Sequence, residues 1–273
     1  MSQLRPPGRA VPSWFDSRPA VIGHRGAAAT APENTVASFR AALGADAVET
    51  DVQLSSDDVA FLLHDDDLDR TTDARAQGIE PATTASTLPW ERLRALDAGA
   101  WAGPEFTGER LPQLAVLAGL LTAALDDGRP LGLDLEIKTP SRHSAASVVE
   151  VVGAELSSPR WTRLLAANAV LVTSFDPDVV ELACSQLPVP VGLLLASTPP
   201  AHEVAALAEV GLTAIVTSHE DLTGDVVTAA HSAGLVVGVY TANNPSDWDR
   251  LVAIDVDAIV TDDPHALLAH LGR

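Results

Sequence analysis

Short apolar runs rich in β-branched residues alternate along the chain with segments of helical periodicity. Strands are predicted over eight runs: Ala20–Gly23, Ala47–Leu54, Leu131–Ile137, Ala169–Ser174, Val191–Leu195, Ala214–Thr217, Leu235–Thr241 and Ala258–Thr261. Helices are predicted between most of them, over Thr35–Leu43, Leu114–Leu125, Ser144–Leu156, Pro177–Leu187, His202–Val210, Gly224–Ala233 and Ser246–Ala253. This alternation is typical of parallel strands that are joined by crossover helices. It therefore predicts an α/β fold, the (β/α)8 TIM barrel.

A ninth apolar run, Val59–Leu63, breaks the alternation. Only the polar segment Ser55–Asp58 separates it from the second predicted strand, whereas a parallel crossover needs about a dozen residues or more. The two runs are therefore predicted to form an antiparallel hairpin. Because the loop is short, the returning strand is expected to bring His64 back to the same height along the hairpin as Glu49 and Asp51 of the second strand.

Periodicity weakens over residues 65–112, where Thr, Asp, Gly and Pro recur. The segment is far longer than a typical connection between a strand and a helix. We expect an insertion over the barrel mouth, within a single catalytic domain that spans residues 1–273. Its side chains Trp90 and Trp101 either cap a substrate or pack the insertion against the barrel.

Ionisable side chains interrupt two predicted buried strands at a spacing of two residues: Glu49 with Asp51, and Glu136 with Lys138. Residues i and i+2 of a strand share a face, so each pair projects into one space. Buried carboxylates are costly when unpaired. Either a divalent metal or an internal salt-bridge network with Arg25 and Lys138 explains them. Oxygen ligands favour Mg²⁺ or Ca²⁺ over zinc.

Two histidines are expected beside these carboxylates. His24 and Arg25 directly follow the first strand, which places them at the C-terminal face of a barrel, and the hairpin brings His64 there. Imidazoles suit general acid and base catalysis, and the alternative is a pair of structural histidines at strand ends. Arg25 and Lys138, the one lysine of the chain, add positive charge that fits a phosphate group.

Neighbouring polar residues have competing interpretations. Glu33 and Asn34 could reach the same site, but Asn34 equally suits the N-cap of the helix predicted from Thr35. The acidic residues Asp65–Asp67 and Asp69 resemble a metal cluster, yet consecutive side chains diverge in direction. We interpret them as a solvated acidic loop.

Composition narrows the classes of function. The chain has 273 residues, 47% of them hydrophobic, and a formal net charge of −20, which disfavours nucleic acids and anionic membrane surfaces as partners. Its single cysteine, Cys184, excludes an intrachain disulfide. Met1–Trp14 lacks the apolar stretch of a signal peptide, and no apolar run approaches the roughly 20 residues of a membrane span. The expected location is the cytoplasm, and the oligomeric state is not predicted.

Several short motifs occur in a fixed order: Gly23-His24-Arg25-Gly26, Pro32-Glu33-Asn34-Thr35, Glu49-Thr50-Asp51-Val52, His64-Asp65 followed by Arg70-Thr71-Thr72, Leu135-Glu136-Ile137-Lys138, Ser174-Phe175 and Thr261-Asp262. Together they resemble the glycerophosphodiester phosphodiesterases. The resemblance spans roughly Val21 to Leu268, nearly the whole chain.

The resemblance implies a phospholipase C-like (β/α)8 barrel that uses one divalent cation, Mg²⁺ or Ca²⁺. It would hydrolyse a small-molecule glycerophosphodiester to sn-glycerol 3-phosphate and an alcohol. The matched positions are the catalytic histidines His24 and His64, the metal ligands Glu49, Asp51 and Glu136, and the phosphate-binding residues Arg25 and Lys138. Either histidine could be the acid, and the nucleophile is water or the glycerol 2-hydroxyl.

Two other functions fit the same residues. One is a phospholipase D-like activity on lysophospholipids or sphingomyelin, and the other is a non-catalytic glycerophosphodiester-binding barrel. The chain departs from the family pattern at the hairpin tip, Ser55-Ser56-Asp57-Asp58, and at Val239-Tyr240-Thr241-Ala242-Asn243, where the family often has a tryptophan. The second departure bears on the wall facing the substrate alcohol, and so on substrate preference more than on reaction type.

Overall fold

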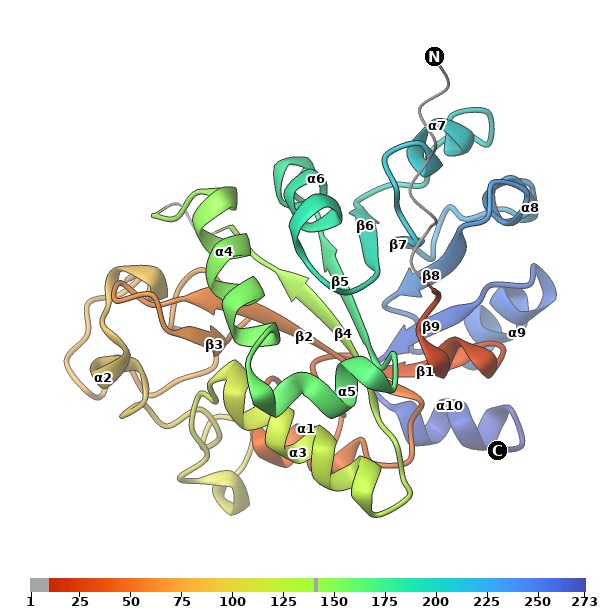
Figure 1. Cartoon of the computed structure of the whole chain (residues 1–273). Coiled ribbons are helices and arrows are strands. Elements are labelled where there is room, and N and C mark those ends of the chain that lie inside the picture. Colours follow the sequence, from red (N-terminus) through yellow and green to blue (C-terminus); the bar gives the residue numbers. More distant parts are fainter. Residues whose placement is uncertain (1–9, 140–141) are drawn as a thin grey trace.

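The computed structural model describes residues 10–139 and 142–273, and it confirms the (β/α)8 barrel. Eight parallel strands of the described chain pair in the order β1-β9-β8-β7-β6-β5-β4-β2, and β2 pairs with β1 to close the ring (Figure 1). Their bounds are β1 Ala20–Gly23, β2 Ala47–Leu54, β4 Gly132–Ile137, β5 Val170–Ser174, β6 Val191–Leu195, β7 Ala214–Ser218, β8 Val236–Tyr240 and β9 Ala258–Thr261. Each strand begins and ends within one residue of its prediction.

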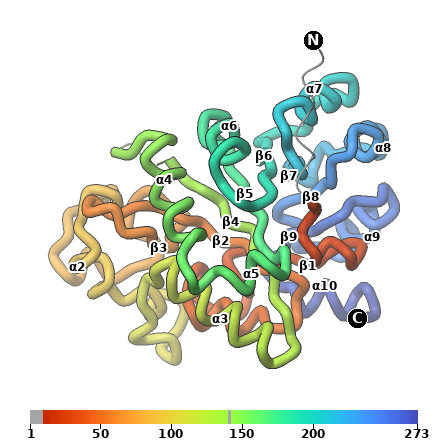
Figure 2. Tube along the Cα trace, in the orientation of Figure 1, coloured from red at the N-terminus to blue at the C-terminus, as the bar shows by residue number. Residues whose placement is uncertain are grey.

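Helices surround the ring of strands, and the first and last strands of the chain lie side by side (Figure 2). The helices are α1 Val36–Ala41, α2 Trp90–Leu93, α3 Leu114–Asp126, α4 Ala145–Leu156, α5 Thr162–Ala166, α6 Pro177–Gln186, α7 Val204–Ala208, α8 Gly224–Ser232, α9 Pro245–Ala253 and α10 Pro264–His270. Short 3-10 helices cover Ser13–Asp16, Ala85–Thr87, Pro104–Phe106 and Pro159–Trp161. Within the described ranges, no helix is long and apolar enough to cross a membrane.

The final helix, α10, was not predicted, although its start carries two local signals. The side chain of Asp263 accepts a hydrogen bond from the backbone N–H of Ala266 at 2.9 Å, and Pro264 occupies the first helical position. The prediction about Met1–Trp14 falls largely on residues outside the described ranges and stays a prediction, as does the single-domain assignment.

The strands read as apolar runs because both of their faces are buried. Their outward side chains form the main core with the inner faces of the helices, where Phe39 of α1 and Trp161 are completely buried. This core leaves the inward side chains near the C-terminal strand ends free to form a site.

The predicted hairpin is confirmed. Strand β3, Ala60–Leu62, runs antiparallel to β2, with Val52 opposite Leu62, and lies outside the closed ring. At its other end β2 pairs with β1, where Gly23 lies opposite Val48. Along this edge the neighbour of β2 therefore changes from β1 to β3, and the change takes place across three residues, Glu49 to Asp51.

The insertion, residues 65–112, extends from β3 at one side of the barrel (Figure 1). Together with β3 it has a hydrophobic core of its own: Phe61, Leu63, Leu68, Ala74, Ile79, Ala85, Leu93, Leu96, Ala98 and Leu111. Trp90 packs against Phe61 with ring centroids 6.1 Å apart, so its role is packing, whereas Trp101 is 45% exposed.

Trp14 closes the N-terminal end of the barrel. Its ring stacks on Phe15 with centroids 4.0 Å apart, and its Nε1 donates to the carbonyl oxygen of Ala169 at 3.2 Å. The ring lies directly over Gly132, at the start of β4. A Cβ atom at position 132 would stand 2.0 Å from Trp14 Cδ1.

We therefore predict that Gly132→Ala displaces Trp14 and lowers the free energy of unfolding by about 1–3 kcal/mol. Chemical denaturation measures the change. The matched control is Gly119→Ala in the exposed face of α3, where an added Cβ meets no atom within 4 Å. That substitution should raise stability by roughly 0.5–1 kcal/mol through helix propensity. Equal effects at both positions would contradict this account of Gly132.

Candidate active site

A pocket of about 170 Å³ opens at the C-terminal ends of the barrel strands. One half is polar, and its lining includes His24, Arg25, Glu49, His64, Asp134, Glu136 and Lys138. The other half is largely apolar, with Phe175, Leu194, Val216, Tyr240 and Val260. A larger hollow of about 470 Å³ lies at the opposite end of the barrel beside Trp14, but none of the predicted site residues lines it.

The three predicted metal ligands come together. Glu49, Asp51 and Glu136 each offer a carboxylate oxygen, and these oxygens lie within 4.8 Å of one another. The side chains are buried, at 8%, 1% and 7% exposure. The register of the parallel strands is the reason, since Asp51 lies opposite Glu136 and Glu49 opposite Asp134.

Asp134 is a fourth buried carboxylate in this cluster, and it was not among the residues predicted from the sequence. It is 2% exposed and accepts a hydrogen bond from Thr173 Oγ1 at 2.7 Å. Its spacing of two residues from Glu136 was the available signal, because that spacing puts both side chains on one face of β4.

Two cations lie against the carboxylates. Lys138 Nζ is 2.6 Å from Glu136 Oε1 and 3.1 Å from Asp51 Oδ1. Arg25 Nε lies 3.7 Å from Asp51 Oδ2, and the Arg25 backbone N–H donates to Glu49 Oε2 at 2.9 Å. If all four carboxyls ionise, they carry four negative charges against the two positive charges of Lys138 and Arg25, and Arg25 also pairs with Glu33. The ion pairs therefore offset at most half of that charge.

The pKa values of the cluster reflect this excess. Burial raises the pKa of Asp134 to about 7, and burial together with Asp51 raises the pKa of Glu136 to about 7. Burial and the neighbouring carboxylates also raise the pKa of Glu49 well above its usual value. Burial acts on Asp51 in the same direction, but Lys138 and Arg25 outweigh it and lower the pKa of that carboxyl. The two cations thus stabilise the ionised form of Asp51 more than that of the other three carboxyls.

Asn34 serves the site and does not cap the helix. Its Nδ2 donates to Asp51 Oδ2 at 2.9 Å, and its Oδ1 accepts from Thr50 Oγ1 at 2.6 Å. The cap of α1 is Thr35, whose side chain accepts from the Ser38 N–H at 3.3 Å. Asn34 has a φ of 55°, a left-handed conformation that asparagine tolerates better than most residues.

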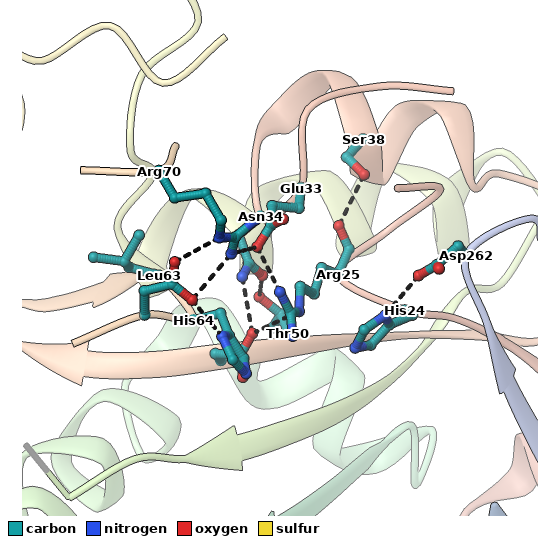
Figure 3. Close-up of polar contacts among 12 residues, drawn as sticks. His24, Arg25, Glu33, Asn34, Ser38, Thr50, Leu63, His64, Arg70 and Asp262 are labelled. Carbon is teal, nitrogen blue, oxygen red and sulfur yellow. Dashed lines mark hydrogen bonds and ion pairs between the residues drawn. The ribbon is translucent and has the colours of Figure 1, made fainter. Parts of the chain in front are cut away.

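Each of the two predicted histidines has its Nδ1 atom held by a carboxylate. Figure 3 shows His24 against Asp262. His24 Nδ1 lies 2.6 Å from Asp262 Oδ1, and His64 Nδ1 lies 2.7 Å from Asp65 Oδ1. An ionised carboxylate only accepts, so Nδ1 carries the proton in both pairs. This leaves Nε2 of each ring available to the pocket, and His24 Nε2 is 4.0 Å from Glu49 Oε2.

The interpretation of Asp65 as part of a solvated loop is wrong. Its carboxylate contacts both His64 and Arg70, and hydrogen bonds from these two residues, against the effect of burial, lower its pKa to about 2. Gln53 fixes the same stretch of backbone, because its Nε2 donates to the carbonyl oxygens of Leu63 at 2.9 Å and Asp65 at 2.8 Å. The chain leaving β3 is thus held on both sides of the imidazole.

The apolar half of the pocket carries an aromatic pair. The rings of Phe175 and Tyr240 meet edge to face, with centroids 5.8 Å apart and an angle of 82° between planes. Tyr240 stands in the late-strand motif that departs from the family pattern, and its hydroxyl donates to the carbonyl oxygen of Leu195 at 2.8 Å. Phe175 is 42% exposed, and Lys138 Nζ lies 6.0 Å from its ring centroid.

A (β/α)8 barrel with buried carboxylates, two histidines and two cations at its C-terminal mouth has the groups needed to bind and hydrolyse a phosphodiester. The model of the glycerophosphoryl diester phosphodiesterase family matches residues 24–266, and the chain belongs to this family. It is an enzyme of the phosphoric diester hydrolase class, as the motifs predicted.

The chain is similar to relatives over nearly its whole length. YhdW of Bacillus subtilis is 31% identical over 258 residues, which cover 91% of this chain and 96% of that protein. The glycerophosphodiester phosphodiesterase of Caldanaerobacter subterraneus subsp. tengcongensis is 29% identical, with the same coverage of 91% and 96%. A phosphodiesterase from Oleispira antarctica, solved in complex with the product sn-glycerol-3-phosphate, has a TM-score of 0.82 and 28% identity, covering 95% of this chain and 99% of that one.

The raised pKa of Asp134 predicts how metal-free protein responds to pH. A carboxyl that binds its proton more tightly when folded favours the folded state at low pH, and this contribution is lost as the pH rises from about 4 to 7. Asp134→Asn keeps an oxygen to accept from Thr173 but cannot ionise. In chelator, the variant should therefore gain about 2–4 kcal/mol of stability relative to wild type across that range. Denaturation curves with parallel pH dependence for the two proteins would contradict the prediction.

Proposed function

We propose that this protein hydrolyses glycerophosphodiesters to sn-glycerol 3-phosphate and an alcohol, using a divalent cation and two histidines as general acid and base. One observation carries the proposal. His24 and His64, each held by a carboxylate at Nδ1, line the same pocket as the buried carboxylates and the two cations. The similar Oleispira antarctica enzyme binds sn-glycerol-3-phosphate as its product.

The residues present fit a hard divalent cation, Mg²⁺ or Ca²⁺. Glu49, Asp51 and Glu136 are the proposed ligands, because their oxygens converge within 4.8 Å and the surrounding cations leave negative charge uncompensated. When bound, such an ion neutralises that charge and polarises a phosphoryl oxygen.

Arg25 and Lys138 are the proposed partners of the other non-bridging phosphate oxygens. Both side chains line the pocket and remain partly accessible, at 14% and 19% exposure. A guanidinium and an ammonium placed there stabilise the negative charge that develops on phosphorus-bound oxygens during the reaction.

Nε2 is the working atom of each proposed catalytic histidine. One histidine, as neutral imidazole, takes a proton from the attacking hydroxyl, and the other, as imidazolium, gives its Nε2 proton to the alkoxide that leaves phosphorus. Asp262 and Asp65 accept from Nδ1 of the two rings, so that each ring exchanges protons at Nε2. Burial lowers the pKa of His64, which favours its neutral, proton-accepting form near neutral pH.

We expect His24→Ala and His64→Ala each to lower kcat by about 10²–10⁴-fold with the fold intact, since each removes a proton-transfer group. Release of glycerol 3-phosphate from glycerophosphocholine measures the loss, and circular dichroism checks the fold. His202→Ala is the matched control, because its side chain is 81% exposed. A His24 or His64 variant with near-normal turnover would remove that histidine from the mechanism.

Chelation tests the cation. Treatment with a chelator should abolish glycerol 3-phosphate release, and addition of Mg²⁺ or Ca²⁺ should restore it, because three carboxylates cannot bind an anionic phosphate without compensating charge. The same assay separates the other functions. A phospholipase D-like enzyme releases choline from lysophosphatidylcholine and leaves lysophosphatidic acid, and a binding protein releases no product. Full activity in chelator would refute metal dependence.

A further inference from the structure

Arg70, near the start of the insertion, binds two carboxylates at once, Asp65 and Glu33. Figure 3 shows its contact with Glu33. Nη1 donates to Glu33 Oε2 at 2.5 Å, and Nε donates to Asp65 Oδ2 at 2.6 Å. Nη2 lies between them and donates to Glu33 Oε1 at 2.8 Å and to Asp65 Oδ1 at 3.0 Å. Every guanidinium nitrogen is used, and both carboxylates are held in the two-pronged geometry that arginine favours.

Both carboxylates also hold a residue of the proposed site. Glu33 Oε1 accepts from Arg25 Nη1 at 2.6 Å, and Asp65 Oδ1 lies 2.7 Å from His64 Nδ1. These are the same two oxygens that receive Arg70 Nη2. Five residues therefore form one continuous chain of hydrogen bonds, from the phosphate-binding guanidinium to the imidazole.

Arg70 does not line the pocket, and each of its guanidinium nitrogens already donates to a carboxylate. Its charge matters to the partners. Glu33 is only 10% exposed in its side chain, and its other cation, Arg25, also faces Asp51. Arg70 therefore supplies the positive charge that Glu33 and Asp65 share.

We propose that Arg70 is a positioning residue, through which the insertion fixes both the phosphate-binding Arg25 and the catalytic His64 by way of Glu33 and Asp65. This inference rests on the proposed roles of Arg25 and His64. Loss of the Glu33 branch loosens Arg25 and weakens substrate binding, whereas loss of the Asp65 branch misorients the imidazole and slows the chemical step. Loss of Arg70 affects both.

The test compares Arg70→Ala with Arg75→Ala in the assay of glycerol 3-phosphate release. Arg75 is a matched control in the same insertion, where it binds Asp69 through Nε at 3.2 Å and Nη2 at 2.9 Å. We expect Arg70→Ala to lower kcat/KM by about 10- to 100-fold, as loss of an orienting partner does. Arg75→Ala should stay within about twofold of wild type.

Separate effects on kcat and on KM distinguish a positioning role of Arg70 from a contribution to stability alone. Glu33→Gln should mainly raise KM, Asp65→Asn should mainly lower kcat, and Arg70→Ala should do both. Double variants combine Arg70→Ala with Glu33→Gln or with Asp65→Asn. The loss of kcat/KM in each should be smaller than the product of the two single losses, because the residues act through the same hydrogen bonds. Millimolar guanidinium should restore part of the activity of Arg70→Ala, and an equal concentration of sodium chloride should not.

Arg70→Lys extends the test if Arg70→Ala does not fold. A lysine keeps the charge but cannot bridge two carboxylates in this planar geometry, so it should also raise KM and lower kcat. Wild-type kcat and KM in the folded Arg70 variants, with only a lower melting temperature, would overturn the inference, as would fully multiplicative losses. A wild-type enzyme and Arg75→Ala that both release no product would instead refute the proposed function itself.

Discussion

Repulsion among four buried carboxylates is the constraint on which the site depends. The parallel register of β2 and β4 puts Glu49, Asp51, Asp134 and Glu136 on one face in a space of low dielectric, where like charges raise one another's pKa. The surrounding groups partly offset that repulsion. Lys138 lies between two of the carboxylates, and backbone and amide N–H groups supply further donors. A chain with a net charge of −20 and one lysine therefore has that lysine where negative charge is most concentrated.

The route of the chain around β2 determines which loops reach these carboxylates. Strand β1 leaves the edge of β2 at Val48, and β3 joins that edge from Val52 onward. Between these points the loop after β1 lies alongside, so Arg25 and Asn34 contact Glu49 and Asp51 directly. The same hairpin returns the chain at His64. The candidate site residues thus gather because one long strand has two different neighbours along one edge.

Much of this arrangement could be predicted from the sequence, because the relevant signals are local. Buried strands show as β-branched runs, carboxylates on one face show as a spacing of two, and the short loop before Val59 requires a hairpin. The contacts that were missed depend on where loops fold back. Asp65 binds His64 and Arg70, which are one and five residues away, but the composition of this stretch does not distinguish a folded-back loop from a solvated one. The contact between Arg70 and Glu33 spans 37 residues and has no local signal. Asp134 is different: its period-two signal was present in the sequence.

The position of β3 outside the ring has an evolutionary consequence. The barrel closes through β1 and β2, so the insertion lies beyond the circuit of strands whose number and tilt fix the barrel's diameter. Descendant sequences can lengthen, shorten or exchange most of that segment without altering the barrel itself, because its small core is separate. Sequence change in the insertion can therefore accumulate independently of change in the barrel, as long as Asp65 and Arg70, which contact His64 and Glu33, persist.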